Sequence, residues 1–393
     1  MTKNKIKISK KITSTEIRKY YKVLKDSSED LSLHFPKTIK YRGFGIVPEL
    51  LLFFFTWVRQ HSGKLILELN PEKQDEIKEF VDSYLGYIIV STAWRHCDIV
   101  NLDGKLLKND LKKFTKTFHS EINNLSDRIT NETVSIVCFD HFSTNKGLPH
   151  WFYDSENKFI TTPSGLENSI HKVLKSISRI YSKRLISNLS ISFDAIVRLV
   201  WELMKNTDEH GTKDHLGQVN LMPNSRGFYL RIHRSSKSNF IKNTDHIGLK
   251  NYYENALLQN DQSFILEMSF FDSGSGLVKN FLGENWNKKL STKDEVNIVR
   301  TCLTKGESSI QSKDEHKGLG LDEVLKLLSK KNGFLKIISG NLILYRDLTQ
   351  HKYQETNDPS NIVLTDWEKM SSDDYTKVNY SEGTLLTLAI PLN

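Results

Sequence analysis

Apolar and polar positions alternate along the first part of the chain in segments that predict helices and strands in turn. The expected elements are a nearly all-apolar helix over 48–59, a short buried strand over 64–69, helical stretches near 72–97 and 105–125, and a strand over 133–139. This alternation indicates an α/β unit over residues 43–150. Turn-forming sequences near 145–162 predict a boundary there, with residues 133–139 as the strand that closes the unit.

The second part of the chain, residues 163–393, shows longer periodic segments. We expect amphipathic helices over 165–185 and 193–209, and strands over 227–233, 263–271, 335–345 and from Gly383 to the end. Segments 235–262 and 346–381 are polar, have no strong period, and are expected to form loops. The predicted fold class is therefore α/β in the broad sense (α+β), with two domains.

Charge is distributed unevenly along the 393 residues. Residues 1–42 contain 12 Lys and Arg against 4 Asp and Glu, which accounts for the whole formal charge of +8. This segment is expected to be a basic, solvated arm, and nucleic acid or an acidic protein is a candidate partner for it. Neither a zinc-finger nor an RNA-binding sequence pattern accompanies it.

Cysteine content and apolar runs bear on the cellular environment. The three cysteines are widely spaced and odd in number, which predicts reduced thiols at Cys97, Cys138 and Cys302. The richest apolar run, residues 49–58, is about half the length that a membrane-spanning helix needs. We therefore expect a cytoplasmic protein that does not interact with membranes.

The helix expected over 193–209 has polar side chains on the face opposite its apolar stripe. Glu202 and Asn206 are four residues apart, so their side chains lie about 6 Å from each other on one face. A carboxylate and an amide oxygen at this spacing can hold a water molecule and a hydrated magnesium ion. On its own, the same pair is typical of a solvated helix face.

Two glycine-containing segments follow. Asp272 ends a predicted strand, and Gly274 and Gly276 allow the backbone after it to turn and to approach a flat ligand. Further on, Gly318-Leu319-Gly320 precedes an amphipathic helix, where free backbone N–H groups and the positive helix end suit phosphates. Either segment alone is equally typical of a turn or a hinge. Finally, Gly383-Thr384 opens the last strand.

ExxxN on a helix, DxGxG after a strand, GLGL before a helix and a final GT strand occur in this order over about 190 residues. In this respect residues 165–393 resemble the GHKL (Bergerat-fold) ATP-binding superfamily, which includes gyrase B, MutL and the histidine kinases. The resemblance implies an α/β sandwich with a mixed, largely antiparallel sheet covered by helices on one face. It does not extend to the N-terminal unit, for which a STAS-like fold is one possibility.

The resemblance also implies ATP and Mg²⁺ as ligands and a role for each motif residue. These roles are general base for Glu202, magnesium ligand for Asn206, adenine recognition for Asp272, contact with the base for Gly274, Gly276 and Thr384, and phosphate binding for Gly318, Leu319 and Gly320. A mobile lid is expected within residues 277–317. Two features depart from the family pattern, namely Thr207 in place of a small residue, and the long polar stretch that precedes Gly383.

These residues predict a magnesium-dependent ATPase that couples slow hydrolysis to lid closure and to assembly with itself or a protein partner. Two alternatives stay open, because a carboxylate base can also activate a serine hydroxyl. One is a serine kinase of the anti-sigma-factor type, and the other is an ATP-gated interaction module that does not hydrolyse ATP. DNA transactions, stress signalling and defence against phage all agree with these features.

Overall fold

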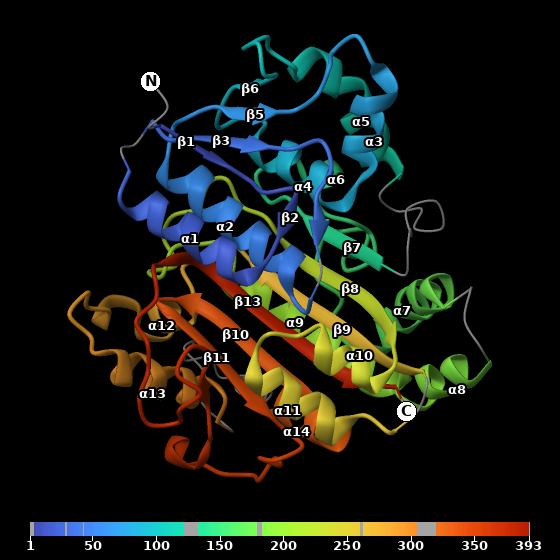
Figure 1. Ribbon diagram of the computed structural model, residues 1–393, viewed down its shortest axis with the longest axis vertical. Coiled ribbons are helices and arrows are strands. Elements are labelled where there is room, and N and C mark those ends of the chain that lie inside the picture. The colour runs from blue at the N-terminus through green and yellow to red at the C-terminus, as the bar shows by residue number, and fades with distance from the viewer. Residues whose placement is uncertain are drawn as a thin grey trace.

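The computed structural model describes residues 4–27, 30–41, 43–121, 133–178, 183–259, 262–304 and 320–392. Two sheets organise these residues (Figure 1). The smaller sheet is parallel, with strand order β1-β3-β5-β6. Its strands are β1 (Lys5–Lys7), β3 (Ser32–Phe35), β5 (Leu65–Leu67) and β6 (Ile99–Val100). A two-stranded parallel ladder, β2 (Lys11–Ile12) with β4 (Lys40–Tyr41), lies nearby.

The larger sheet has seven strands in the order β12-β11-β10-β13-β9-β8-β7, and each neighbouring pair is antiparallel. The strands are β7 (Thr133–Cys138), β8 (Arg226–Ser235), β9 (Ser263–Asp272), β10 (Phe334–Gly340), β11 (Leu342–Asp347), β12 (Thr365–Asp366) and β13 (Ser381–Pro391). The predicted α/β class and the largely antiparallel C-terminal sheet are confirmed. The expected closing strand, 133–139, belongs to this sheet instead, because β7 pairs with β8.

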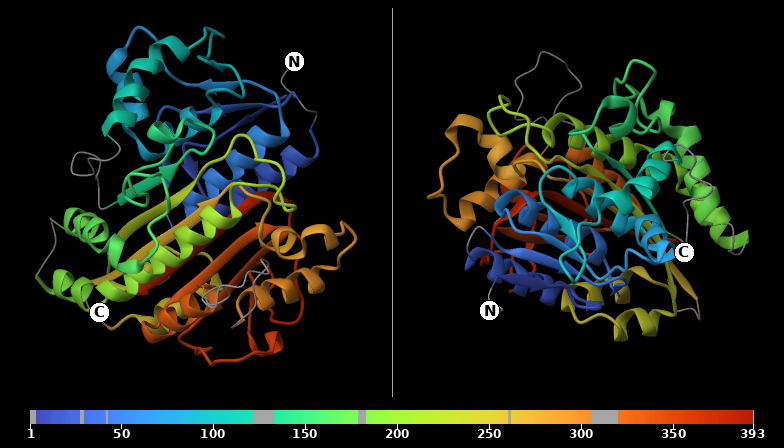
Figure 2. Two further views of the ribbon diagram at one scale, coloured as in Figure 1. Left: turned by 180° about the vertical axis from the view of Figure 1, so that it is seen from behind. Right: turned by 90° about the horizontal axis from the view of Figure 1, so that it is seen from above.

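Helices cover both faces of the large sheet, whereas one covered face was expected. The face turned to the viewer in the left view of Figure 2 carries α9 (Phe193–His210), with α7 (Pro163–Ile177) and α14 (Gly320–Lys330) beside it. Apolar side chains of these helices and of alternate strand positions form one core, which includes Leu203, Leu328 and Leu388. The period of 3.6 in α9 thus produces the burial pattern that its sequence predicts.

Helix α2 (Ile46–Gln60) covers the opposite face and is buried on nearly all sides. Toward the large sheet, the Phe55 ring lies 5.9 Å from that of Phe271. Toward the small sheet, Phe54 packs against Phe35 with ring centroids 6.0 Å apart. A helix that is apolar all round belongs inside a core, and α2 joins the two sheets into a single body.

The basic N-terminal segment is folded and is not a solvated arm. Its isoleucines, among them Ile6, Ile8 and Ile17, are buried, while the lysines between them point outward. Helix α1 (Ser14–Lys25) begins at a capping box in which Thr13 and Glu16 each bond to the other's backbone N–H. The arm prediction failed because short strands with exposed lysines resemble a charged tail in composition.

The remaining α-helices lie mainly near the surface, except for α4, which is largely buried. They are α3 (Gln74–Asp82), α4 (Tyr84–Ala93), α5 (Lys108–Glu121), α6 (Thr144–Gly147), α8 (Lys183–Ile191), α10 (Lys237–Lys242), α11 (Ile247–Ala256), α12 (Leu277–Leu282) and α13 (Thr292–Cys302). The segment 235–262 was expected to be a loop, but α10 and α11 form there. Tyr252 of α11 donates a hydrogen bond to the Ala389 carbonyl, 3.2 Å away, which fixes this helix on the large sheet. Within the described ranges, every helix is too short or too polar to cross a bilayer.

Candidate functional site

Helix α9 presents the predicted polar pair beside the large sheet. Its apolar stripe, including Leu203 and Met204, is buried, which leaves Glu202 and Asn206 half-buried on the other side. Burial raises the pKa of Glu202, with Glu323 and Glu209 adding to the increase and Lys205 opposing it. Among the described residues, no hydrogen-bond partner contacts either side chain of the pair. Both polar groups are therefore available to a ligand.

The beginning of helix α14 meets this pair directly. A Cβ atom placed on Gly320 would lie 3.2 Å from Glu202 Oε2 and 3.4 Å from both amide atoms of Asn206. A larger residue at this position would press against the ends of both side chains, so glycine suits this close approach. The N-terminal, positive end of the α14 dipole therefore lies beside the carboxylate and the amide, and such a helix end favours anions. Gly318 and Leu319, which were expected to take part, lie outside the described residues.

Asp272 lies at the C-terminal end of α9, where strand β9 ends. A Cβ atom placed on Gly211 would lie 2.7 Å from Asp272 Cβ. A Cβ atom placed on Gly274 would lie 2.9 Å from Gly211 Cα. The two glycines thus let the strand end touch the helix end. The Asp272 carboxylate accepts a hydrogen bond of 2.8 Å from the Gly274 N–H. Burial raises the pKa of Asp272 to about 6, while the backbone N–H groups of Gly274 and Thr384 oppose the increase.

Thr384 lies beside Asp272 despite the long polar stretch that precedes it in sequence. Strand β13 pairs with β9 so that Thr384 is opposite Asp272. Ser339 of β10 lies next to both motifs, since its Oγ is 3.4 Å from the Thr384 hydroxyl and accepts a 2.8 Å hydrogen bond from the Leu277 N–H. Gly276, with φ of +86°, makes the turn into α12 that this contact needs.

The structure therefore brings the described motif residues together in two groups joined by α9. Asp272, Gly274, Gly276 and Thr384 form one group, and Glu202, Asn206 and Gly320 form the other. At about 1.5 Å per residue, the helix separates position 202 from position 211 by roughly 14 Å. This length suits an elongated ligand with a hydrogen-bonding group at one end and an anionic group at the other.

Several residues that support the site had no recognisable pattern in the sequence. Arg226 of β8 is almost fully buried and forms ion pairs of 2.8 Å with Asp140 and with Asp208 of α9. Asn224 donates a 2.7 Å hydrogen bond to the Gly211 carbonyl at the end of the same helix. These contacts fix the C-terminal half of α9 relative to β8. They link residues far apart in sequence, so no local pattern could have indicated them.

Within the described ranges, there is no group of three or more His, Cys, Asp or Glu side chains suited to a metal ion. Comparisons of the chain with protein-family models, with curated proteins and with solved structures found no match.

Proposed function

We propose that the protein binds Mg-ATP along α9 and hydrolyses it slowly, with the adenine at Asp272 and the phosphates at Gly320. The single observation that carries this proposal is the meeting of three motifs on one helix. Asp272 touches the C-terminal end of α9 through Gly211, and the N-terminus of α14 touches Glu202 and Asn206. Segments up to about 120 residues apart in sequence thus border a single helix.

At the adenine end, the Asp272 carboxylate accepts a hydrogen bond from the exocyclic amine of the base. With a pKa of about 6, this carboxyl is mostly ionised at pH 7 and is a strong acceptor. Guanine presents a carbonyl oxygen at the same position of its ring system, which would face the carboxylate without a proton between them. The site should therefore discriminate strongly against GTP, since a buried acceptor without a donor is costly.

At the phosphate end, the backbone N–H groups at the start of α14 bind phosphate oxygens. Asn206 would hold the magnesium ion through its amide oxygen, and an amide that forms no hydrogen bond with any described residue and lies beside Gly320 fits this task. Bound Mg²⁺ supplies positive charge that offsets the charge on the phosphates. Lys205 lies on the same helix, with its ammonium 4.8 Å from the centre of the Trp201 ring.

Glu202 takes a proton from the attacking water. Its raised pKa makes it a better base than an exposed glutamate, because efficiency increases as the pKa approaches the working pH. The segment from α12 through α13 follows the adenine motif and leads toward α14, so its movement would couple the bound nucleotide to the protein surface. The expected consequence is assembly with a second copy or with a protein partner.

The proposal is tested by isothermal titration with Mg-ATP and Mg-GTP and by phosphate release. We expect the parent to bind ATP in preference to GTP and to release phosphate. Glu202→Gln should retain binding and lose phosphate release by about 10²–10⁴-fold, since it removes only the proton acceptor. Glu167→Gln, an exposed change on α7, is the matched control.

Absence of ATP binding by the parent would refute the proposal. Transfer of labelled γ-phosphate to a protein, in place of free phosphate, would identify a kinase. Tight binding with neither product would identify an ATP-gated module.

A further inference from the structure

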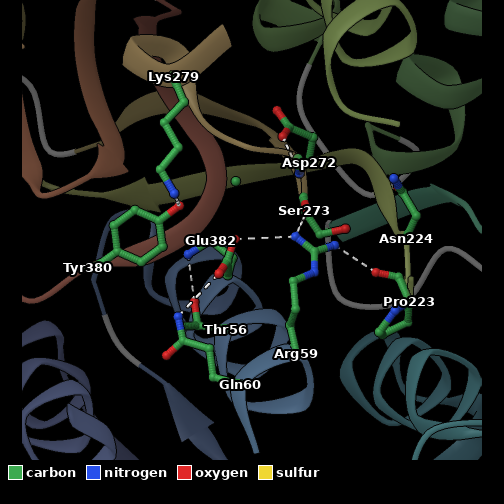
Figure 3. Close-up of polar contacts among 12 residues, drawn as sticks. Thr56, Arg59, Gln60, Pro223, Asn224, Asp272, Ser273, Lys279, Tyr380 and Glu382 are labelled. Carbon is green, nitrogen blue, oxygen red and sulfur yellow. Dashed lines mark hydrogen bonds and ion pairs between the residues drawn. The ribbon is translucent and has the colours of Figure 1, made fainter. Parts of the chain in front are cut away.

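Arg59, in the last turn of α2, reaches from the N-terminal unit to the edge of the large sheet (Figure 3). Its Nη1 donates to the Ser273 carbonyl and lies 3.4 Å from Glu382 Oε2. Its Nη2 donates a 2.8 Å hydrogen bond to the Pro223 carbonyl. Only 13% of the side chain is exposed, so one buried guanidinium connects three separate segments of the C-terminal half.

Each of these three segments adjoins the adenine end of the candidate site. Ser273 lies between Asp272 and Gly274 in the DxGxG motif. Glu382 precedes Gly383-Thr384 on β13. Pro223 precedes Asn224, whose side chain bonds to the last turn of α9. The planar fork of arginine can donate to several acceptors at fixed angles, which a lysine ammonium does with less geometric control.

Further contacts reinforce this connection from the same N-terminal helices. Thr56 Oγ accepts a 3.0 Å hydrogen bond from the Glu382 N–H, and Gln60 donates to the Glu382 carboxylate over 3.2 Å. From α4, the Thr92 hydroxyl lies 2.8 Å from that of Ser225. Ser225 in turn exchanges hydrogen bonds of 2.9–3.0 Å with Ser273. The N-terminal unit thus supports the adenine motif from behind at several adjacent points.

The charge on Arg59 also acts on the motif. Burial lowers the pKa of Arg59, and the neighbouring Glu382 carboxylate opposes that decrease. Two cations face Asp272, Arg59 from α2 and Arg226 from β8, and both limit the increase that burial causes in the pKa of Asp272. Removing Arg59 should therefore shift the ionisation of Asp272 to higher pH.

We propose that Arg59 is a positioning residue that holds the Asp272 segment in its adenine-binding geometry, so that ATP affinity depends on the docking of α2. This inference rests on the proposed function. By thermodynamic reciprocity, ATP should in turn tighten the contact between α2 and the large sheet. A partner that displaces the end of α2 would then release nucleotide.

The test is the pH dependence of ATP binding by the full chain, measured by isothermal titration between pH 5 and pH 8.5. In the parent, affinity should fall as the pH decreases through about 6, where Asp272 becomes protonated. We expect Arg59→Met to weaken binding at pH 8 by at least tenfold and to move the midpoint of the pH profile upward. Arg59→Lys keeps the positive charge, so the midpoint of its pH profile should equal that of the parent. Its affinity for ATP should stay below that of the parent, because lysine lacks the planar fork of arginine. Arg95→Met, an exposed change after α4, is the matched control.

A solely structural role for Arg59 would lower thermal stability without moving the pH midpoint, and that result would overturn the inference. If Arg59→Met does not fold, Thr56→Val removes one contact to Glu382 with little change in shape and should weaken ATP binding several-fold. ATP binding by Thr56→Val equal to that of the parent would overturn the inference in that case. If the parent binds ATP and Arg59→Met binds it equally well, this inference alone is refuted. If the parent does not bind ATP, the proposed function is refuted as well.

Discussion

Asp272→Asn should make the ligand-free protein more stable at neutral and alkaline pH while it removes adenine recognition. The aspartate is 92% buried, and its pKa is about 6 in the folded protein against 3.8 for an ordinary aspartate. Asparagine has the same shape, and its carbonyl oxygen can still accept the hydrogen bond from the Gly274 N–H. The substitution therefore removes the buried charge and retains the hydrogen bond from Gly274, whereas the Thr384 N–H loses its acceptor, which reduces the gain.

The sign and size of the effect follow from proton linkage. Between pH 4 and pH 6 the folded protein binds a proton that the unfolded chain has released, so the free energy of unfolding falls as the pH increases. Above pH 6 the loss is complete, and it corresponds to about 3 kcal/mol. Asp272→Asn should avoid this loss, with a gain of up to about 3 kcal/mol at pH 8 that is about 2 kcal/mol smaller at pH 4.5.

Urea denaturation followed by tryptophan fluorescence at pH 4.5 and pH 8 measures this difference. Asp373→Asn, at an exposed position, is the control and should change the free energy of unfolding little at either pH. Isothermal titration should show that Asp272→Asn no longer binds ATP. A variant less stable than the parent at pH 8, or a gain that is equal at both pH values, would refute the argument that Asp272 is a buried, destabilising charge retained for binding.

Two further predictions concern the metal and the core. Mg²⁺ should increase the affinity for ATP at least tenfold less in Asn206→Ala than in the parent, whereas the affinity without metal should stay close to that of the parent. Titrations with Mg²⁺ and with a chelator measure this difference. An unchanged Mg²⁺ effect would contradict the assignment of Asn206 as the metal ligand. Lys336→Met should lower the free energy of unfolding by about 3–5 kcal/mol, because it leaves Glu49, 2.9 Å away and equally buried, without its counter-charge. Urea denaturation measures the loss, and the double variant Lys336→Met/Glu49→Leu should recover much of it.

The sequence predicted those parts of the site that depend on local patterns. The stripe of α9 fixes which side of the helix Glu202 and Asn206 occupy, and the alternation in β9 places Asp272 at its end. The pairing of Thr384 with Asp272 was harder to predict, because the segment before β13 is long. That segment is held partly by Asp366, whose carboxylate accepts hydrogen bonds from the backbone N–H groups of Glu368 and Thr376.

Contacts between distant segments could not be predicted in this way. Strand β7 pairs with β8, which follows about 90 residues later in the sequence. The apolar pattern of β7 alone does not contain this information, and the prediction therefore assigned β7 to the wrong sheet. Arg59 and Arg226 resemble ordinary surface arginines until the fold surrounds them. One signal was present in the sequence, however. An α2 segment that is apolar on every side indicates burial between two layers, and it could have predicted that the large sheet is covered on both faces.

The position of α2 between two sheets also has a consequence for synthesis of the chain. The small-sheet strands β1 and β3 precede α2, and β5 follows it closely. Of the two large-sheet strands that α2 contacts, β9 and β13, the first begins roughly 200 residues after α2 ends. At about 5–20 residues per second, the ribosome needs roughly 10–40 seconds to supply that strand. During this interval, one side of a phenylalanine-rich helix faces water, and the nascent chain depends on chaperones or temporary internal contacts to prevent aggregation.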